Sequence, residues 1–220
     1  KTNTFLVVDE CFEEFLDEPE AYSIIPFLEK LSHVFVLKAF TKIYAMAGLR
    51  LGYALCSNED VLTKICQVRQ PWSVSGLAQR AGIAALKETE YVLKTRKLVH
   101  EQRKKMEAAL TELGYIVYPS QANYIFFKEK TLEGATDSLY DRMLKQGVLI
   151  RSCSNYPGLD ASCYRICVKT EEENREVLHK LSQCTVTKRT DIKCTDTKHT
   201  DTVYTDANPT QAPHRPEKEE

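Results

Sequence analysis

The sequence has no excess of charge, no long apolar run and no Cys-x-x-Cys pair. Among its 220 residues, 30 basic side chains nearly balance 31 acidic ones, so we expect neither nucleic acid nor an anionic membrane as a partner. No apolar run approaches the ~20 residues that span a bilayer, so we expect no segment that crosses a membrane. The eight cysteines are scattered, mostly in apolar surroundings, which argues against a disulfide framework and favours a reducing, cytoplasmic location.

A metal site is not expected either. The grouping that offers enough ligands is Cys184, Cys194, His199 and His214, and its spacing matches no zinc pattern. The chain opens with Lys1 and enters an apolar run at once, which is too short and strand-like for a signal peptide. We therefore expect a portion of a longer protein.

Apolar runs separated by polar turns fill the first third of the chain. They predict strands at 4–8, 33–37 and 51–56, and short helices at 23–31 and 59–67. The first run is continuous rather than alternating, which predicts a strand buried on both faces of a parallel sheet. Elements in this order and density favour an α/β layer architecture.

The rest of the chain predicts a long helix followed by a smaller α+β unit. Apolar spacing indicates a helix over 76–113, with Gly114 as its C-terminal stop. Strands are expected at 115–118, 124–127, 148–151 and 163–168, and helices at 139–145 and from a Thr170–Glu173 capping box to about 183. We divide the chain into part of a large domain (1–75), an interdomain helix (76–113), a small α+β C-terminal domain (114–184) and a tail (185–220). The tail is rich in Thr, Asp, Lys and Pro and is expected to be disordered.

A lysine and an arginine lie eight positions apart in the stretch 40–53. The side chain of Lys42 forms Schiff bases with carbonyl compounds, and that of Arg50 is shaped to hold a phosphate. Gly48 and Gly52 flank the arginine and are expected to let the backbone approach a ligand. A lysine alone is more often on the surface than in a site. Here we expect Lys42 to be held away from water, with a lowered pKa that frees its amine.

Asp9 comes directly after the first predicted strand, at the edge where ligands bind in open α/β sheets. Spacing leaves a helix cap or a solvated loop acid equally open. The acidic residues that follow are expected to form only a solvated face: Glu13, Glu14, Asp17, Glu18 and Glu20.

Two arginines belong to predicted strands of the second unit. Strand alternation places Tyr164, Ile166 and Val168 on the core face and Arg165 on the opposite face. An arginine in an apolar strand needs an anionic partner, and periodicity alone favours a structural acid over a bound carboxylate. Arg151 leads into a polar, turn-rich loop of the kind that lines sites.

Several of these motifs, in this order, resemble a known family. They are Val8-Asp9-Glu10, Thr41-Lys42, Gly48-Leu49-Arg50-Leu51-Gly52-Tyr53, Arg165, Thr170 and Glu173-Asn174. The chain resembles fold-type I pyridoxal-phosphate (PLP) enzymes of the histidinol-phosphate aminotransferase branch. Within that branch, the stretches 71–74 and 151–159 are most similar to the threonine-phosphate decarboxylases of cobalamin biosynthesis. The resemblance implies the C-terminal part of an aspartate aminotransferase-like large domain with a parallel or mixed sheet, plus a small α+β domain.

The resemblance also implies a cofactor, PLP, and roles for its ligands. Lys42 would hold PLP as a Schiff base and move the substrate proton. Asp9 would pair with the protonated pyridine nitrogen, keeping the ring an electron sink. Arg50 would bind the cofactor phosphate, with Thr41 beside the lysine as a further cofactor contact.

For the substrate, the resemblance implies that Arg165 holds the α-carboxylate and Arg151 holds a phosphate. The reaction expected first is decarboxylation of O-phospho-L-threonine to aminopropanol phosphate. The alternative is an aminotransferase for an amino acid phosphate such as histidinol phosphate. The resemblance further implies a cytoplasmic homodimer.

Three departures from the family pattern stand against these expectations. Ala39 replaces a serine that usually binds the cofactor phosphate, and Phe12 replaces a tyrosine that usually bonds the ring hydroxyl. The long segment that precedes the aspartate strand in relatives, with its ring-stacking aromatic residue, is also missing. A second alternative is therefore a non-catalytic, truncated remnant.

Overall fold

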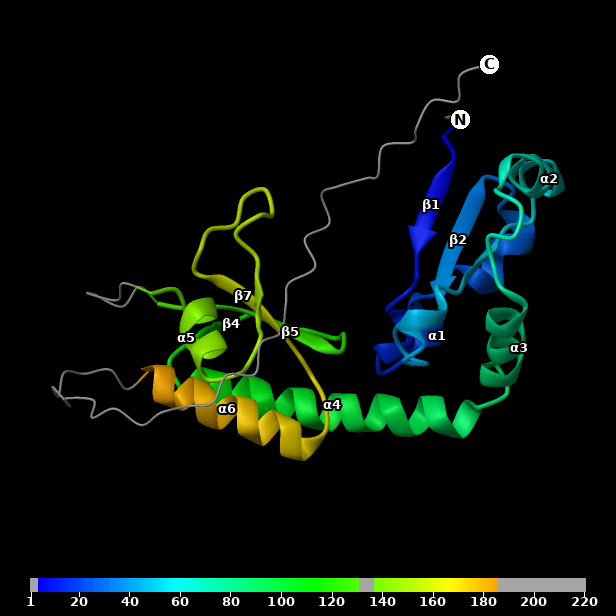
Figure 1. Cartoon of the computed structure of the whole chain (residues 1–220). Coiled ribbons are helices and arrows are strands. Elements are labelled where there is room, and N and C mark those ends of the chain that lie inside the picture. Colours follow the sequence, from blue (N-terminus) through cyan, green and yellow to red (C-terminus); the bar gives the residue numbers. More distant parts are fainter. Residues whose placement is uncertain (1–3, 131–136, 186–220) are drawn as a thin grey trace, which may run out of the picture. The chain divides into compact units, whose positions relative to one another are not determined.

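The computed structural model describes residues 4–130 and 137–185. Its first sheet has the order β1–β2–β3, formed by β1 (Leu6–Asp9), β2 (Val34–Ala39) and β3 (Gly52–Leu55). β1 and β2 run parallel, with Leu6 opposite Val34, whereas β3 is antiparallel to β2. The three predicted strands are thus confirmed, and the sheet is mixed. Figure 1 shows β1 and β2 side by side.

β1 does not have the burial that its sequence predicts. Among the described residues it pairs with β2 alone, and its apolar side chains Leu6 and Val7 are 47 % and 56 % exposed, as is the preceding Phe5 at 42 %. The expectation of a strand buried on both faces is wrong for this chain. A continuous apolar run indicates a strand that is stable when both faces are buried, but it does not identify the segments that bury them.

Short helical turns connect the strands of this sheet. They are η1 (Glu13–Phe15), α1 (Pro19–Tyr22), η2 (Ile25–Lys30) and η3 (Ala47–Leu49). The helix predicted at 23–31 is a 3₁₀ helix, because the Leu31 N–H bonds the Leu28 carbonyl three residues back at 3.0 Å. α2 (Glu59–Val68) begins as predicted, since the Asn58 side chain accepts from the Val61 N–H at 3.2 Å.

The long helix predicted over 76–113 is two helices, α3 (Gly76–Ala85) and α4 (Thr89–Glu112). Between them, Lys87 and Glu88 donate to carbonyls three residues back, and this tighter turn ends α3. Neither Gly nor Pro lies at the break, so apolar spacing alone predicted one continuous helix. Gly114 does end α4, in the left-handed region at φ 89°.

The second sheet has the order β4–β5–β7–β6, and every neighbouring pair is antiparallel. Its strands are β4 (Ile116–Val117), β5 (Tyr124–Lys128), β6 (Arg151–Ser152) and β7 (Cys163–Cys167). β6 begins at the last residue of the predicted strand 148–151. α5 (Leu139–Lys145) and α6 (Glu171–Thr185) are the two helices expected here. α6 opens with the predicted capping box, in which the Glu173 N–H donates to the Thr170 hydroxyl and Glu173 accepts from the Thr170 N–H.

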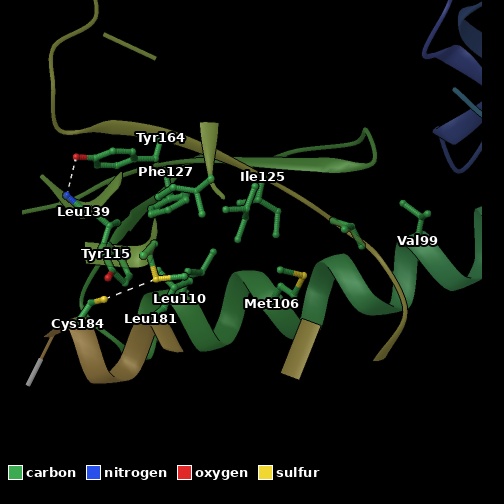
Figure 2. Packing of buried hydrophobic residues seen from close by; sticks show 14 of the residues in the cluster. Val99, Met106, Leu110, Tyr115, Ile125, Phe127, Leu139, Tyr164, Leu181 and Cys184 are labelled. Atoms are coloured by element: carbon green, nitrogen blue, oxygen red, sulfur yellow. Dashed lines mark hydrogen bonds between the residues drawn. The ribbon is translucent and has the colours of Figure 1, made fainter. Parts of the chain in front are cut away.

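The main hydrophobic core lies between the second sheet and helices α4, α5 and α6 (Figure 2). Ile125, Phe127, Tyr164 and Ile166 supply the sheet side, as the alternation of the two strands predicts. The Tyr164 hydroxyl is buried but accepts a hydrogen bond from the Leu139 N–H at 3.2 Å, which avoids an unpaired polar group in the core. This core fixes the sheet whose opposite face carries Arg165.

No helix in the described ranges is long and apolar enough to cross a membrane. The described residues also contain no group of three or more potential metal ligands. The remaining members of the weighed metal grouping, Cys194, His199 and His214, lie outside the described residues, as does the tail from residue 186 onward. The division into domains stays a prediction.

Candidate functional site

Asp9 ends β1, and its carboxylate is held by the residue two positions on. The Cys11 N–H donates to Asp9 Oδ1 at 2.9 Å. The Cys11 thiol and this N–H lower the pKa of Asp9, and the nearby Lys42 ammonium adds to the effect. In return, burial and the Asp9 carboxylate raise the pKa of Cys11 to about 11. Asp9 is therefore an ionised acid beside a neutral thiol, at the carboxyl edge of the parallel pair.

Lys42 lies in the turn that follows β2, next to the half-buried Thr41. Its side chain is exposed, so the expectation of a lysine held away from water is wrong within the described residues. The Lys42 ammonium lies 5.1 Å from the ring centroid of Phe12, a cation–π contact. Phe12 thus occupies the position beside the lysine without offering a hydroxyl group.

Arg50 follows η3 with a left-handed backbone, φ 52°, which is strained for a residue with a Cβ atom. Its guanidinium donates to the Ala47 carbonyl at 3.0 Å and is otherwise exposed. At Gly52 the structure shows a packing requirement of its own. A Cβ at Gly52 would lie 3.0 Å from the Lys38 carbonyl, so this glycine lets β3 approach β2.

A pair of aromatic rings connects Lys42 to the second sheet. The ring of Phe12 meets that of Tyr124 edge to face, with centroids 5.7 Å apart. The Arg165 guanidinium makes a cation–π contact with Tyr124 on β5, 4.7 Å from its ring centroid. Asp9 and Phe12 line an open cavity of about 600 Å³ together with Tyr124. The structure therefore brings Asp9, Lys42 and Arg165, which are far apart in sequence, to one region.

Arg151 and Arg165 lie directly opposite each other on β6 and β7. Directly opposed side chains point to the same face of a sheet, and like charges in that position repel. No ion pair joins either arginine to an acid within 4–130 and 137–185. The structural acid that periodicity favoured for Arg165 is thus absent from the described residues.

The two arginines lie in open surroundings with a mixed polar and apolar lining. Arg151 Nη2 donates to Asn155 Oδ1 at 3.4 Å, and its guanidinium lies 5.9 Å from the Tyr156 ring centroid. Both arginines line a second cavity of about 600 Å³, together with Lys169. The two acids that line this cavity are paired with lysines, Glu173 with Lys169 at 2.7 Å and Glu176 with Lys180 at 2.6 Å. The guanidinium groups therefore remain to bind an anion.

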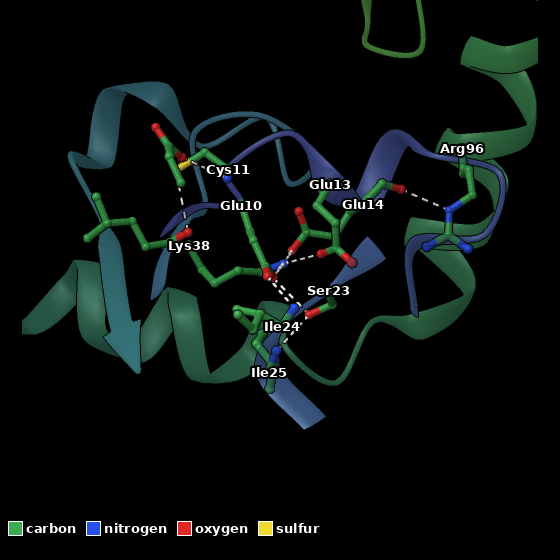
Figure 3. Close-up of polar contacts among 11 residues, drawn as sticks. Glu10, Cys11, Glu13, Glu14, Ser23, Ile24, Ile25, Lys38 and Arg96 are labelled. Atoms are coloured by element: carbon green, nitrogen blue, oxygen red, sulfur yellow. Dashed lines mark hydrogen bonds and ion pairs between the residues drawn. The ribbon is translucent and has the colours of Figure 1, made fainter. Parts of the chain in front are cut away.

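A buried charge cluster, which the sequence reasoning missed, supports the Asp9 and Lys42 segments (Figure 3). Lys38 is 6 % exposed, and its ammonium lies 2.6 Å from Glu13, 2.8 Å from Glu14 and 3.8 Å from Glu10. Burial alone would lower the pKa of Lys38, but its hydrogen bonds to Glu13 and Glu14 outweigh this and raise it. Burial raises the pKa of Glu13.

The expectation that these acids form only a solvated face is wrong for Glu13 and Glu14. A signal was available in the sequence, because Lys38 continues the buried alternation of Val34 and Val36 along β2. A lysine on the core face of a strand requires buried acidic partners.

The fold and the residues gathered here define the class. The mixed sheet with its helices and the second, antiparallel sheet is the fold of aspartate aminotransferase-like proteins. The structure matches Thermus thermophilus aspartate aminotransferase, a tetra mutant, with a TM-score of 0.60 and 28 % identity, over 82 % of this chain and 51 % of that one.

The family follows from the sequence. The model of the family "Aminotransferase class I and II" matches residues 1–181, and the chain belongs to that family. Threonine-phosphate decarboxylase of Salmonella typhimurium is 37 % identical over 180 residues, covering 81 % of this chain and 48 % of that protein. The histidinol-phosphate aminotransferase structure from Clostridium acetobutylicum has a TM-score of 0.76 and 31 % identity, over 82 % of this chain and 54 % of that chain. The chain therefore spans about half the length of the relatives it matches.

The family is PLP-dependent, and the residues present fit the cofactor. The exposed amine of Lys42 suits an aldehyde, and the ionised carboxylate of Asp9, held by Cys11, suits a pyridinium. The exposed guanidinium of Arg50, which bonds only the Ala47 carbonyl within the described residues, suits a phosphate. The assignment of each residue to one of these groups is a proposal.

Proposed function

We propose that this chain forms one wall of a PLP-dependent active site that acts on a phosphorylated amino acid. The proposed reaction is decarboxylation of O-phospho-L-threonine. The observation that carries the proposal is the opposed pair Arg151 and Arg165, two guanidinium groups on one face without an acid partner among the described residues. A substrate with a carboxylate and a phosphate supplies one anion for each of them.

In this proposal, Lys42, Asp9, Arg50 and Thr41 hold the cofactor. When bound, PLP supplies an aldehyde carbon for the amine and a ring that withdraws electrons from the substrate. Asp9 is ionised, since the Cys11 donors lower its pKa, so it keeps a proton on the ring nitrogen. Lys42 Nζ accepts and returns protons, and the exposed Arg50 binds the phosphate.

Arg165 and Arg151 orient the substrate. We propose that Arg165 binds the α-carboxylate, because its guanidinium packs on Tyr124, which contacts Phe12 beside Lys42. Arg151, at the start of the loop 153–162, binds the phosphate. The two guanidinium groups together set which bond at the α-carbon faces the ring, and this selects decarboxylation or amino transfer.

The second candidate function is amino transfer to or from an amino acid phosphate such as histidinol phosphate. Its support is the match to the Clostridium acetobutylicum structure of that name. Release of carbon dioxide from O-phospho-L-threonine favours the first candidate, whereas 2-oxoglutarate-dependent loss of the amino group favours the second. We further propose residues 1–75 as part of a cofactor-binding domain, 76–113 as the interdomain helical segment and 114–184 as a small α+β domain, in a cytoplasmic homodimer.

Covalent labelling of Lys42 tests the cofactor part. The chain is incubated with PLP, reduced with borohydride, digested and mapped by mass spectrometry. We expect the pyridoxyl label on Lys42, and its loss from that peptide in Lys42→Arg. The exposed Lys64 provides the control Lys64→Arg, which should keep the label on Lys42. A label spread evenly over surface lysines would support the non-catalytic alternative instead.

Calorimetry with O-phospho-L-threonine tests the arginine pair. Because charge-assisted hydrogen bonds contribute about 1.5–3 kcal/mol, Arg165→Gln and Arg151→Gln should each weaken binding about tenfold or more. The control is Arg69→Gln, at the exposed end of α2, which should bind as the parent chain does. Equal affinity in all four proteins would contradict the assignment.

A further inference from the structure

Cys153 and Cys163 are directly opposed across β6 and β7. The register pairs Arg151 with Arg165 and Ser152 with Tyr164, and the next pair in this register is Cys153 with Cys163. The Cys153 N–H donates to the Cys163 carbonyl at 2.9 Å, which continues the ladder by one residue. The registers of the two sheets oppose no other pair of described cysteines.

Both side chains share the face of the arginine pair, since each cysteine lies two residues from an arginine along its strand. Both are free thiols, 3 % and 4 % exposed. The Cys153 thiol lies near the Arg151 carbonyl at 4.0 Å, and the Cys163 thiol lies 3.6 Å from Asp160 Oδ1. Burial raises the pKa of the Cys153 thiol, and the nearby Cys163 thiol adds to this effect.

The backbone geometry suits a covalent bond. Directly opposed residues that share a hydrogen bond of this kind have Cα atoms about 5.5 Å apart, and disulfides have Cα separations of about 4.4–6.8 Å. The Cα separation expected at such an opposed pair therefore lies within the range found in disulfides. The residues between them, 154–162, are mostly exposed and belong to no helix or strand, and segments of this kind open at low free-energy cost.

We propose that Cys153 and Cys163 form a reversible disulfide by exchange with a small-molecule disulfide such as oxidised glutathione. One protein thiolate attacks a sulfur of the reagent and releases a first glutathione thiolate. The second protein thiolate then attacks the protein sulfur of the mixed disulfide and releases the second. The protein dithiol loses two electrons and two protons, and the reagent disulfide is reduced to two thiols.

The disulfide closes the loop 154–162 at its base and holds β6 in register with β7. Because the closed loop is already ordered in the free chain, less conformational entropy is lost when an anion binds at Arg151 and Arg165. This consequence rests on the proposed function of the two arginines, whereas formation of the disulfide does not.

The test equilibrates the full chain in glutathione buffers, starting from the reduced and from the oxidised protein. Of the eight thiols counted in denaturant in the reduced chain, we expect two to disappear on oxidation. Peptide mapping should find the 153 and 163 peptides joined. Cys153→Ser and Cys163→Ser should each retain glutathione on the remaining cysteine, and Cys167→Ser, an exposed control on the same strand, should form the disulfide normally. Near-ultraviolet circular dichroism checks that every variant is folded.

Two results would overturn the proposal. One is glutathione on the exposed Cys66 while both Cys153 and Cys163 stay reduced at equilibrium. The other is a bond from either residue to a different cysteine. Binding of inorganic phosphate, several-fold tighter in the oxidised than in the reduced chain, tests the coupling to the arginine pair. Equal phosphate affinity would reject the coupling, and no phosphate binding in either form would point to failure of the proposed function rather than of the disulfide.

Discussion

Lys38 is the residue on which the geometry of the cofactor edge depends. It lies on the core face of β2, four positions before Lys42, and contacts carboxylates from the end of β1 and from η1. Glu10 is fixed in turn by the Ser23 hydroxyl at 2.9 Å and the Ile24 N–H at 2.8 Å. One buried ammonium group thereby joins the segments that carry Asp9, Phe12 and Lys42.

Lys38→Met should therefore destabilise the fold strongly. The substitution leaves Glu13 and Glu14 buried without a cation, and breaking a buried pair costs about 3–5 kcal/mol. Urea unfolding at neutral pH measures the loss. Lys64→Met, on the exposed surface of α2, is the control and should change the free energy of unfolding by less than about 0.5 kcal/mol. The difference between the variants should shrink in acid, where protonated carboxyls need no partner. Similar stability of both variants at neutral pH would contradict this role of Lys38.

The helices are fixed by residues at their ends. Glu173 in the capping box of α6 accepts from Lys169 at 2.7 Å and from the Thr170 hydroxyl at 2.8 Å. These hydrogen bonds lower the pKa of Glu173 from 4.5 to about 2. The α6 terminus is thus a local unit whose stability follows from a few adjacent residues.

The effect of Glu173 should depend on pH in a defined direction. Because its pKa is lower in the folded chain, its stabilisation is complete above the ordinary value of 4.5 and is lost as the pH falls towards about 2. The difference in unfolding midpoint between the parent chain and Glu173→Gln should therefore be largest near neutral pH and vanish near pH 2. Glu172→Gln, one residue earlier on the exposed side of α6, should show no such trend. A difference that stays constant with pH would reject the capping contribution.

Gly114 ends α4 through its backbone alone. At φ 89° no neighbouring atom lies within 4 Å of an added Cβ, so the whole cost of a side chain is conformational. We expect Gly114→Ala to lower the free energy of unfolding by about 1–2 kcal/mol. Gly76→Ala, also in open space but without a positive φ, should be neutral or slightly stabilising. Thermal denaturation of the pair measures this, and equal melting temperatures would show that α4 ends differently.

At the scale of the molecule, the β1 edge is an exposed apolar surface. Val7 is 56 % exposed on a strand whose second edge is unpaired within the described residues. Such edges associate with other strands in solution. We expect the chain to self-associate with rising concentration and Val7→Lys to reduce this, as measured by analytical ultracentrifugation. Leu149→Lys removes a comparably exposed leucine away from this edge and should have a smaller effect. Equal association of the two variants would place the contact elsewhere.

Local sequence determined most of the helices and strands and several of their ends. Thr170 and Gly114 mark helix ends as predicted, because capping depends on neighbours within four residues. The alternation of β7 assigned its core face correctly, since side chains on a strand alternate. The residues that carry the family resemblance were likewise visible in the sequence, and the match over residues 1–181 confirms the family.

Tertiary structure alone decided which of these residues meet. That Lys38 is paired within a buried cluster, that Phe12 connects Lys42 to Tyr124, and that Arg165 has no acid partner among the described residues depend on segments far apart in the chain. The same holds for the exposure of β1 and the opposition of Cys153 and Cys163. Periodicity specifies the face on which a side chain lies. Register, burial and charge pairing are set by the partner strand, and a local pattern contains no information about that partner.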